Sequence, residues 1–205
     1  MLSEILSPAK LHRSAILLAV DDLYKFGFLN PEDRPYEFPN VWAFQRTSGG
    51  TRLAIAPARD QVDCLLRLIE VMPEPFWLLY VLVVPRGGGE SGRYQCPEPQ
   101  TRDVVKGFLQ DFRSFLETDG RHHFWIASVS DPAMLVYDRH NLIYGYGPLD
   151  EFVTILSGTD LKESPTVQIP DPHVHHYNED LDKDEHTLLM HWEWVGTPLR
   201  DSDDD

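Results

Sequence analysis

The chain of 205 residues suits a single domain, and its 42% apolar and 25% charged residues are typical of a soluble globular protein. Its 33 acidic and 18 basic residues give a formal net charge of -15 at pH 7. Because this charge would repel nucleic-acid backbones and anionic membrane surfaces, we expect neither nucleic acid nor membrane as a partner. A basic protein partner is favoured, since opposite electrostatic fields speed encounter.

The acidity is concentrated at one end of the chain. Residues 179–205 hold ten acidic and two basic residues, a net charge of -8, while the 178 residues before them carry only -7. After Pro165 the chain becomes polar and irregular. We therefore expect a core α+β domain over residues 1–165, followed by an acidic, histidine-containing segment, 166–205, that packs on the core or trails from it.

Cellular location is indicated by signals that the sequence lacks. There is no secretory signal and no apolar stretch of membrane-spanning length, which predicts a cytoplasmic protein. The two cysteines are Cys64, on the apolar side of an expected helix, and Cys96, in a polar loop. We expect reduced thiols in that compartment, and the sequence leaves one disulfide between them open.

The first expected element is a helix over residues 8–27, because a serine followed by proline is typical of a helix start. Two strands, 41–46 and 52–56, flank a Ser-Gly-Gly sequence that predicts a hairpin. An amphipathic helix opened by Asp60 follows, since its apolar residues recur at helical spacing.

The segment 76–84 is an unbroken apolar run between Pro75 and Pro85. Proline lacks an N–H and biases the residue before it toward extended geometry, which argues against a helix here. The run is rich in β-branched and aromatic residues and shows no polar alternation. It predicts a central strand covered on both faces.

The rest of the chain alternates helices with strands. An Asp-Arg-His-Asn sequence before Leu142 predicts a second hairpin, because Asn tolerates positive φ and Asp can bond the backbone of a turn. The remaining expected elements are a glycine-rich loop, a helix, a strand, the hairpin strands and two short helices: 86–93, 101–120, 124–129, 134–137 with 142–146, 149–156 and 184–194.

This order predicts the fold class. Helices are interleaved with hairpins, so a purely parallel sheet is not expected. The sequence predicts an α+β fold with a mixed or mainly antiparallel sheet of five to six strands and helices packed on it.

A histidine cluster is the first candidate site. In an extended segment, residues i and i+2 project to the same face, so His173 and His175 could share a divalent metal ion. The alternative is a surface loop whose histidines bond backbone carbonyls; no other cofactor is expected. The candidate metal ligands are His173, His175, His176, Glu179, His186 and His191.

The spacing of His173, His175 and Glu179 resembles the first metal motif of cupins. The resemblance covers seven residues, and it implies that these side chains bind a metal in an all-β fold. The flanking glycines of that motif are absent and the chain is rich in helices, so the resemblance does not extend to the fold.

The acidic end is a second candidate site. Tryptophans beside carboxylates suit a cationic partner, although the same rings could instead anchor the segment to the core. The candidate partner-binding residues are Glu179, Asp180, Asp182, Asp184, Glu185, Trp192 and Trp194.

No catalytic residue is identified from the sequence. The chain has neither a nucleophile elbow nor a complete phosphate-binding glycine motif. His123 and His140 would meet only through tertiary folding.

Two functions are consistent with these features. The first is a non-enzymatic, acidic protein-binding domain, with an immunity-type protein that neutralises a basic toxin as its concrete form. Bacterial immunity proteins are similar in kind, being commonly small, acidic and α+β. The alternative is a metal-dependent enzyme that uses the histidines of residues 173–191.

Overall fold

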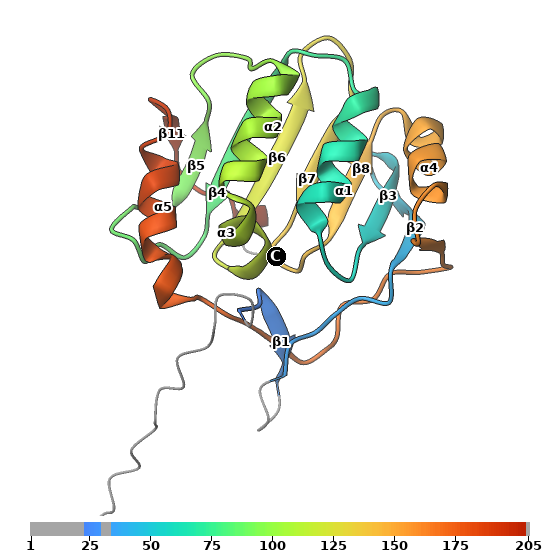
Figure 1. Ribbon diagram of the computed structural model, residues 1–205, viewed down its shortest axis with the longest axis horizontal. Coiled ribbons are helices and arrows are strands. Elements are labelled where there is room, and N and C mark those ends of the chain that lie inside the picture. Colours follow the sequence, from blue (N-terminus) through green and yellow to red (C-terminus); the bar gives the residue numbers. More distant parts are fainter. Residues whose placement is uncertain (1–22, 30–33, 204–205) are drawn as a thin grey trace, which may run out of the picture.

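The computed structural model describes residues 23–29 and 34–203, which form an α+β fold built on one large sheet (Figure 1). The strands of this sheet are β2 (Val41–Thr47), β3 (Gly50–Ala56), β4 (Phe76–Leu82), β5 (Gly92–Gln95), β6 (His122–Ser128), β7 (Met134–Tyr137), β8 (Ile143–Tyr146), β9 (Lys162–Glu163) and β11 (Val195–Thr197). A separate two-stranded antiparallel sheet contains β1 (Phe26–Phe28) and β10 (His173–His175). The α-helices are α1 (Gln61–Leu68), α2 (Arg102–Asp111), α3 (Arg113–Thr118), α4 (Leu149–Ser157) and α5 (Asp182–Leu189), and the 3-10 turns are η2 (Ile69–Val71), η3 (Glu179–Leu181) and η4 (Asp201–Asp203).

The large sheet has the strand order β11-β5-β4-β6-β7-β8-β3-β2-β9. All neighbouring strands are antiparallel except β2 and β9, which are parallel. The expected class, with a mixed and mainly antiparallel sheet, is therefore confirmed. The strand number is higher than the expected five to six, because short strands such as β5, β9 and β11 carry no periodic signal.

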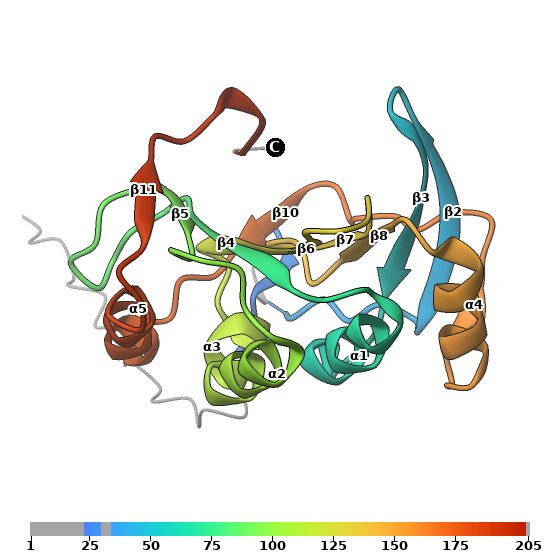
Figure 2. The same cartoon turned by 90° about the horizontal axis from the view of Figure 1, so that it is seen from above.

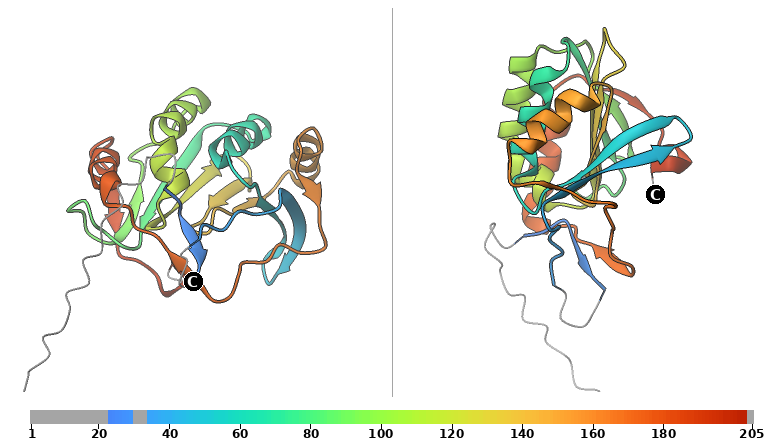
Figure 3. Two further views of the ribbon diagram at one scale, coloured as in Figure 1. Left: turned by 60° about the horizontal axis from the view of Figure 1, so that its bottom comes forward. Right: turned by 90° about the vertical axis from the view of Figure 1, so that its right-hand side faces the viewer.

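The five α-helices lie on the same side of the large sheet, and the chain after β11 passes to the other side (Figure 2). The helices bury a single apolar core against the sheet, since their apolar faces and the inward residues of the strands belong to one cluster. We call the side without helices the open face. The small β1–β10 sheet lies beyond one end of the large sheet (Figure 3).

Strand β4 lies inside the large sheet, between β5 and β6, as its sequence predicts. Its helix-side residues are fully buried: Phe76, Leu78, Tyr80 and Leu82. On the open face, by contrast, Leu79 is only half-buried. The expectation that both faces would be covered is met in full on the helix side only.

The predicted hairpins are confirmed as β2–β3 and β7–β8, and Asn141 adopts the positive φ of 60° that its turn requires. The expected helix over 101–120 is broken at Phe112 into α2 and α3. The expected helix over 8–27 is wrong at its end, because Phe26 belongs to strand β1. The part of that helix up to residue 22 lies outside the described residues.

The segment 166–203 supplies β10, α5 and β11 and packs on the sheet and helices. Trp192 stacks on Phe108 of α2 with ring centroids 4.9 Å apart, and Trp194 is likewise packed on the core cluster. Cys64 and Cys96 are both buried and unpaired, so they form no disulfide. Over the described part of the chain, no helix is long and apolar enough to cross a bilayer.

Arg121 joins the C-terminal segment to the core through ion pairs. Its guanidinium is fully buried and binds Asp119 through Nε at 2.7 Å and Glu185 through Nη1 at 2.6 Å. Glu185 also accepts hydrogen bonds from the backbone N–H groups of Arg86 and Gly87, at 3.0 Å and 2.7 Å. Helix α5 is therefore fixed to the loop after β4 by a buried carboxylate.

Candidate metal centre

The turn between β7 and β8 holds His140 in place. The Asp138 carboxylate accepts hydrogen bonds from the backbone N–H groups of His140 and Leu142, at 2.8 Å and 2.9 Å, through one oxygen. This is the turn chemistry expected from Asp at that position. His140 is 7% exposed, so the turn buries its imidazole instead of leaving it in solvent.

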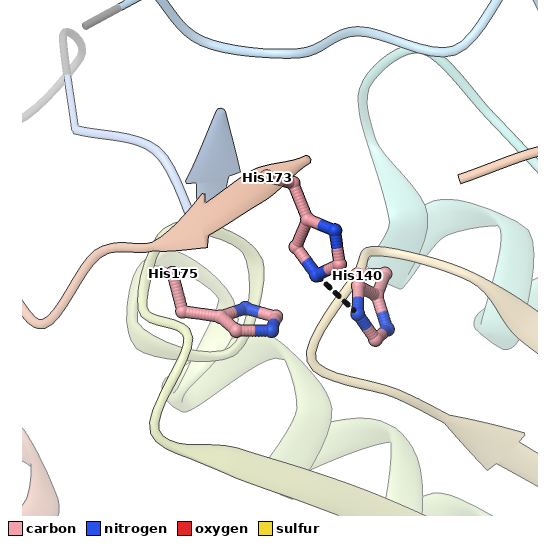
Figure 4. Close-up of side chains that lie close together, drawn as sticks. All are labelled: His140, His173 and His175. Atoms are coloured by element: carbon pink, nitrogen blue, oxygen red, sulfur yellow. Dashed lines mark hydrogen bonds between the residues drawn. The ribbon is translucent and has the colours of Figure 1, made fainter. Parts of the chain in front are cut away.

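Strand β10 brings two further histidines to the same place. It pairs with β1, and Phe28 lies opposite His173 while Phe26 lies opposite His175. Because residues i and i+2 of a strand face the same side, both rings project from one face of β10 toward His140 (Figure 4).

The three histidines form a compact cluster. The candidate ligand atoms of His140, His173 and His175 all lie within 4.8 Å of one another. The buried ring of Phe26 packs edge-on against His140 and His173, with centroid separations of 5.6 Å and 6.1 Å. The cluster therefore packs against a rigid apolar side chain.

Two of the rings have their Nδ1 atoms committed to oxygen acceptors. His140 Nδ1 lies 3.1 Å from Asp138 Oδ2, and His173 Nδ1 lies 2.9 Å from the carbonyl oxygen of Pro170. An oxygen acceptor holds the proton on Nδ1 and leaves Nε2 with its lone pair, as in ligating histidines supported by a carboxylate or carbonyl. Yet the two Nε2 atoms face each other at 3.2 Å (Figure 4).

This arrangement fits a metal ion. Two neutral imidazoles with protons on Nδ1 repel when their Nε2 lone pairs meet at that distance, unless a proton or cation lies between them. Zinc–nitrogen bonds of about 2.0–2.1 Å in a tetrahedron place neighbouring ligand nitrogens about 3.3 Å apart, close to the observed separation. His175 adds a third nitrogen donor, and its buried Nδ1 has no hydrogen-bond partner among residues 23–29 and 34–203.

The protonation of the site also suits a cation. Burial, helped by the positive charge of Arg139, lowers the pKa of His175 to about 2, so its ring is neutral and able to coordinate. Burial alone would raise the pKa of the Asp138 carboxyl, but the hydrogen bonds from the His140 ring and from the backbone N–H of Leu142 help to hold it below its usual value. A carboxylate behind the ring makes His140 a stronger donor.

The other candidate ligands from the sequence lie outside this cluster. The next residue on the chain, His176, packs its ring against Tyr24 at 4.2 Å. Glu179 and His186 are exposed, and His191 packs against Phe108. Of the six, the structure brings together His173 and His175.

The candidate partner-binding residues differ in how far they are exposed to solvent. Glu185 is fully buried, and both Glu185 and Asp182 are engaged by ion pairs with Arg121. Glu179 and Asp180 are exposed, and Asp184 is half-buried. Trp192 and Trp194 are partly buried against the core cluster.

Comparisons of this chain with protein-family models, with curated proteins and with solved structures find no match. The geometry of the cluster therefore carries the functional argument.

The sequence predicts the turn that holds His140, but it does not predict that His140 belongs to the histidine cluster. The signal was present in the Asp-x-His order, which places a carboxylate behind the ring. What joins His140 to His173 is the pairing of β1 with β10, and a strand of three residues gives no periodicity to detect.

Proposed function

We propose that the protein is a metal-dependent enzyme whose centre is a divalent transition metal ion, most simply zinc, bound by His140, His173 and His175. The observation that carries this proposal is the 3.2 Å approach of two Nε2 atoms whose Nδ1 partners are both oxygen acceptors. Imidazole nitrogen is a preferred zinc ligand.

The number of ligands supports a catalytic role over a structural one. Structural zinc sites are closed by four protein ligands, whereas catalytic sites use three and keep one position for water or substrate. The cluster offers three histidines and no fourth ligand among the described His, Cys, Asp and Glu residues. A zinc ion here would lower the pKa of a bound water to about 7 and so supply hydroxide near neutral pH.

Metal titration tests the site. Calorimetry of chelator-treated protein with zinc should give one site per chain. His140→Ala, His173→Ala and His175→Ala should each weaken binding by at least tenfold, while His186→Ala and His191→Ala should leave it unchanged. Equal affinity in wild type and in His140→Ala would remove this site from consideration.

A cobalt-substituted protein tests the open position. Azide added to Co²⁺-loaded protein should change its visible absorption if one coordination position is exchangeable. A tetrahedral cobalt spectrum that azide leaves unaltered would show a closed, structural site and contradict the catalytic role.

The alternative of an acidic docking surface for a basic partner has weaker support. Two of its five proposed carboxylates, Asp182 and Glu185, form ion pairs with Arg121 and are not available to a partner. Both tryptophans pack on the core instead of standing free for a partner.

A further inference from the structure

A cavity on the open face of the sheet adjoins the histidine cluster, and His140 forms part of its wall. Its volume is about 390 Å³, within the range of small-molecule sites. Three aromatic rings, those of Trp125, Tyr144 and Tyr146, line it together with apolar side chains such as Met134. Such walls suit a flat, apolar ligand body, because aromatic faces stack on planar groups.

Arg52 provides a cationic group in this cavity. Its Nε donates to Gln45 Oε1 at 2.7 Å and its Nη1 to the hydroxyl of Tyr146 at 2.7 Å, while the guanidinium lies 3.8 Å from the ring centroid of Tyr144. All of these partners are neutral. In the described part of the chain, no Asp or Glu lies within ion-pair distance of Arg52, although the protein has many more acids than bases.

The carboxylates that line the cavity are already engaged by groups of the protein. Asp138 is engaged by His140 and by two backbone N–H groups. Asp203 binds the buried guanidinium of Arg93 at 2.5 Å and accepts from the backbone N–H of Arg200 at 2.7 Å. Arg52 is therefore the cation of the cavity wall that has no ion-pair partner among the described residues.

We propose that this cavity binds a small, flat aromatic molecule carrying one carboxylate, with the carboxylate on Arg52 and the ring between Trp125 and the two tyrosines. A guanidinium recognises a carboxylate through parallel N–H donors, and its orientation here is fixed in advance by Gln45 and Tyr146. The site does not require the metal, although Asp138 and His140 form part of its wall.

Calorimetry with 2-naphthoate and its neutral analogue 2-naphthamide tests the proposal on the full chain. Naphthoate should bind wild-type protein at one site, and the amide at least about tenfold more weakly, since hydrogen bonds to charged groups are the stronger ones. In Arg52→Gln the difference between acid and amide should disappear. Arg46→Gln, on the same hairpin and facing the other side of it, should keep the full difference.

Three results would overturn the proposal: no binding of naphthoate, equal binding of acid and amide by the wild type, or a preference for the acid that survives Arg52→Gln. If Arg52→Gln does not fold, Arg52→Lys replaces it, and should reduce the preference for the acid because the planar fork is lost. Chelator-treated wild-type protein should bind naphthoate as untreated protein does, because Arg52 and the three aromatic rings lie outside the histidine cluster. This comparison separates failure of the cavity proposal from failure of the metal proposal.

Discussion

Asp138 holds both ends of His140: one carboxylate oxygen accepts the backbone N–H at 2.8 Å, and the other lies 3.1 Å from the ring Nδ1. One side chain therefore fixes the turn and the tautomer of the imidazole. Nε2 is left with its lone pair directed at His173.

Asp138→Asn should weaken zinc binding by about 10–100-fold, the usual cost of changing a residue that orients a ligating histidine. The new amide nitrogen would face Nδ1 and favour the tautomer whose Nε2 carries the proton. Competition with a chromophoric chelator measures the effect. Asp131→Asn, at an exposed loop position, is the matched control, and equal affinities in the two variants would contradict the role of Asp138.

Acid should destabilise the metal-free protein. Burial lowers the pKa of His122 well below its usual value and that of His123 to about 4, whereas both titrate near 6.5 in the unfolded chain. Between these values the unfolded chain binds more protons, so the free energy of unfolding falls as pH drops below about 6.5. The loss should approach about 1.4 kcal/mol per pH unit for each histidine.

Urea unfolding in the presence of a chelator, at about pH 7, 6 and 5, measures this slope. His123→Gln should flatten it, and His186→Gln, at an exposed position of α5, is the control. A midpoint that stays constant over this range would show that these rings are not buried in neutral form.

Removing the buried carboxylate of α5 should destabilise the fold. Glu185→Ala removes one of the carboxylates paired with the buried guanidinium of Arg121 and the acceptor of two backbone N–H groups, and should cost about 3–5 kcal/mol in the free energy of unfolding. Glu179→Ala, at an exposed position just before α5, should change it by about 0.5 kcal/mol or less. Similar urea midpoints for the two variants would refute the structural role of Glu185.

Neighbouring leucines of β4 should respond differently to a charge. Leu78 is fully buried against the helices, so Leu78→Asp should prevent folding, because an unpaired buried carboxylate costs several kcal/mol. Leu79 is half-buried on the open face, and Leu79→Asp should fold with a lowered melting temperature. Circular dichroism distinguishes the two outcomes, and equal behaviour would show that Leu79 is covered as completely as Leu78.

The sequence predicted the elements whose signals are local. The apolar run of β4 and the turn at Asn141 are examples, because strand composition and turn chemistry act over a few residues. Two of the three ligands of the candidate site could be read in the same way, since His-x-His places two rings on one face of any extended segment.

The rest of the fold and of the candidate site depends on pairings between distant parts of the chain. Phe26 fits a helical pattern with the residues before it, yet it lies opposite His175 in a strand pair. Long-range pairing overrides local preference in such cases. The same pairing brings His173 to His140, so the third ligand could not be identified from spacing.

The pairing of β1 with β10 also determines when the metal can bind. These strands join residues 26–28, near the beginning of the described chain, to residues 173–175, and β7 and β8 must already be paired to present His140. Closing so long a loop is entropically unfavourable until other contacts shorten it, so we expect this contact to form late in folding. In zinc fingers the ion drives the chain to fold. Here we expect the apoprotein to fold without metal, and the ion to bind only after the chain has folded.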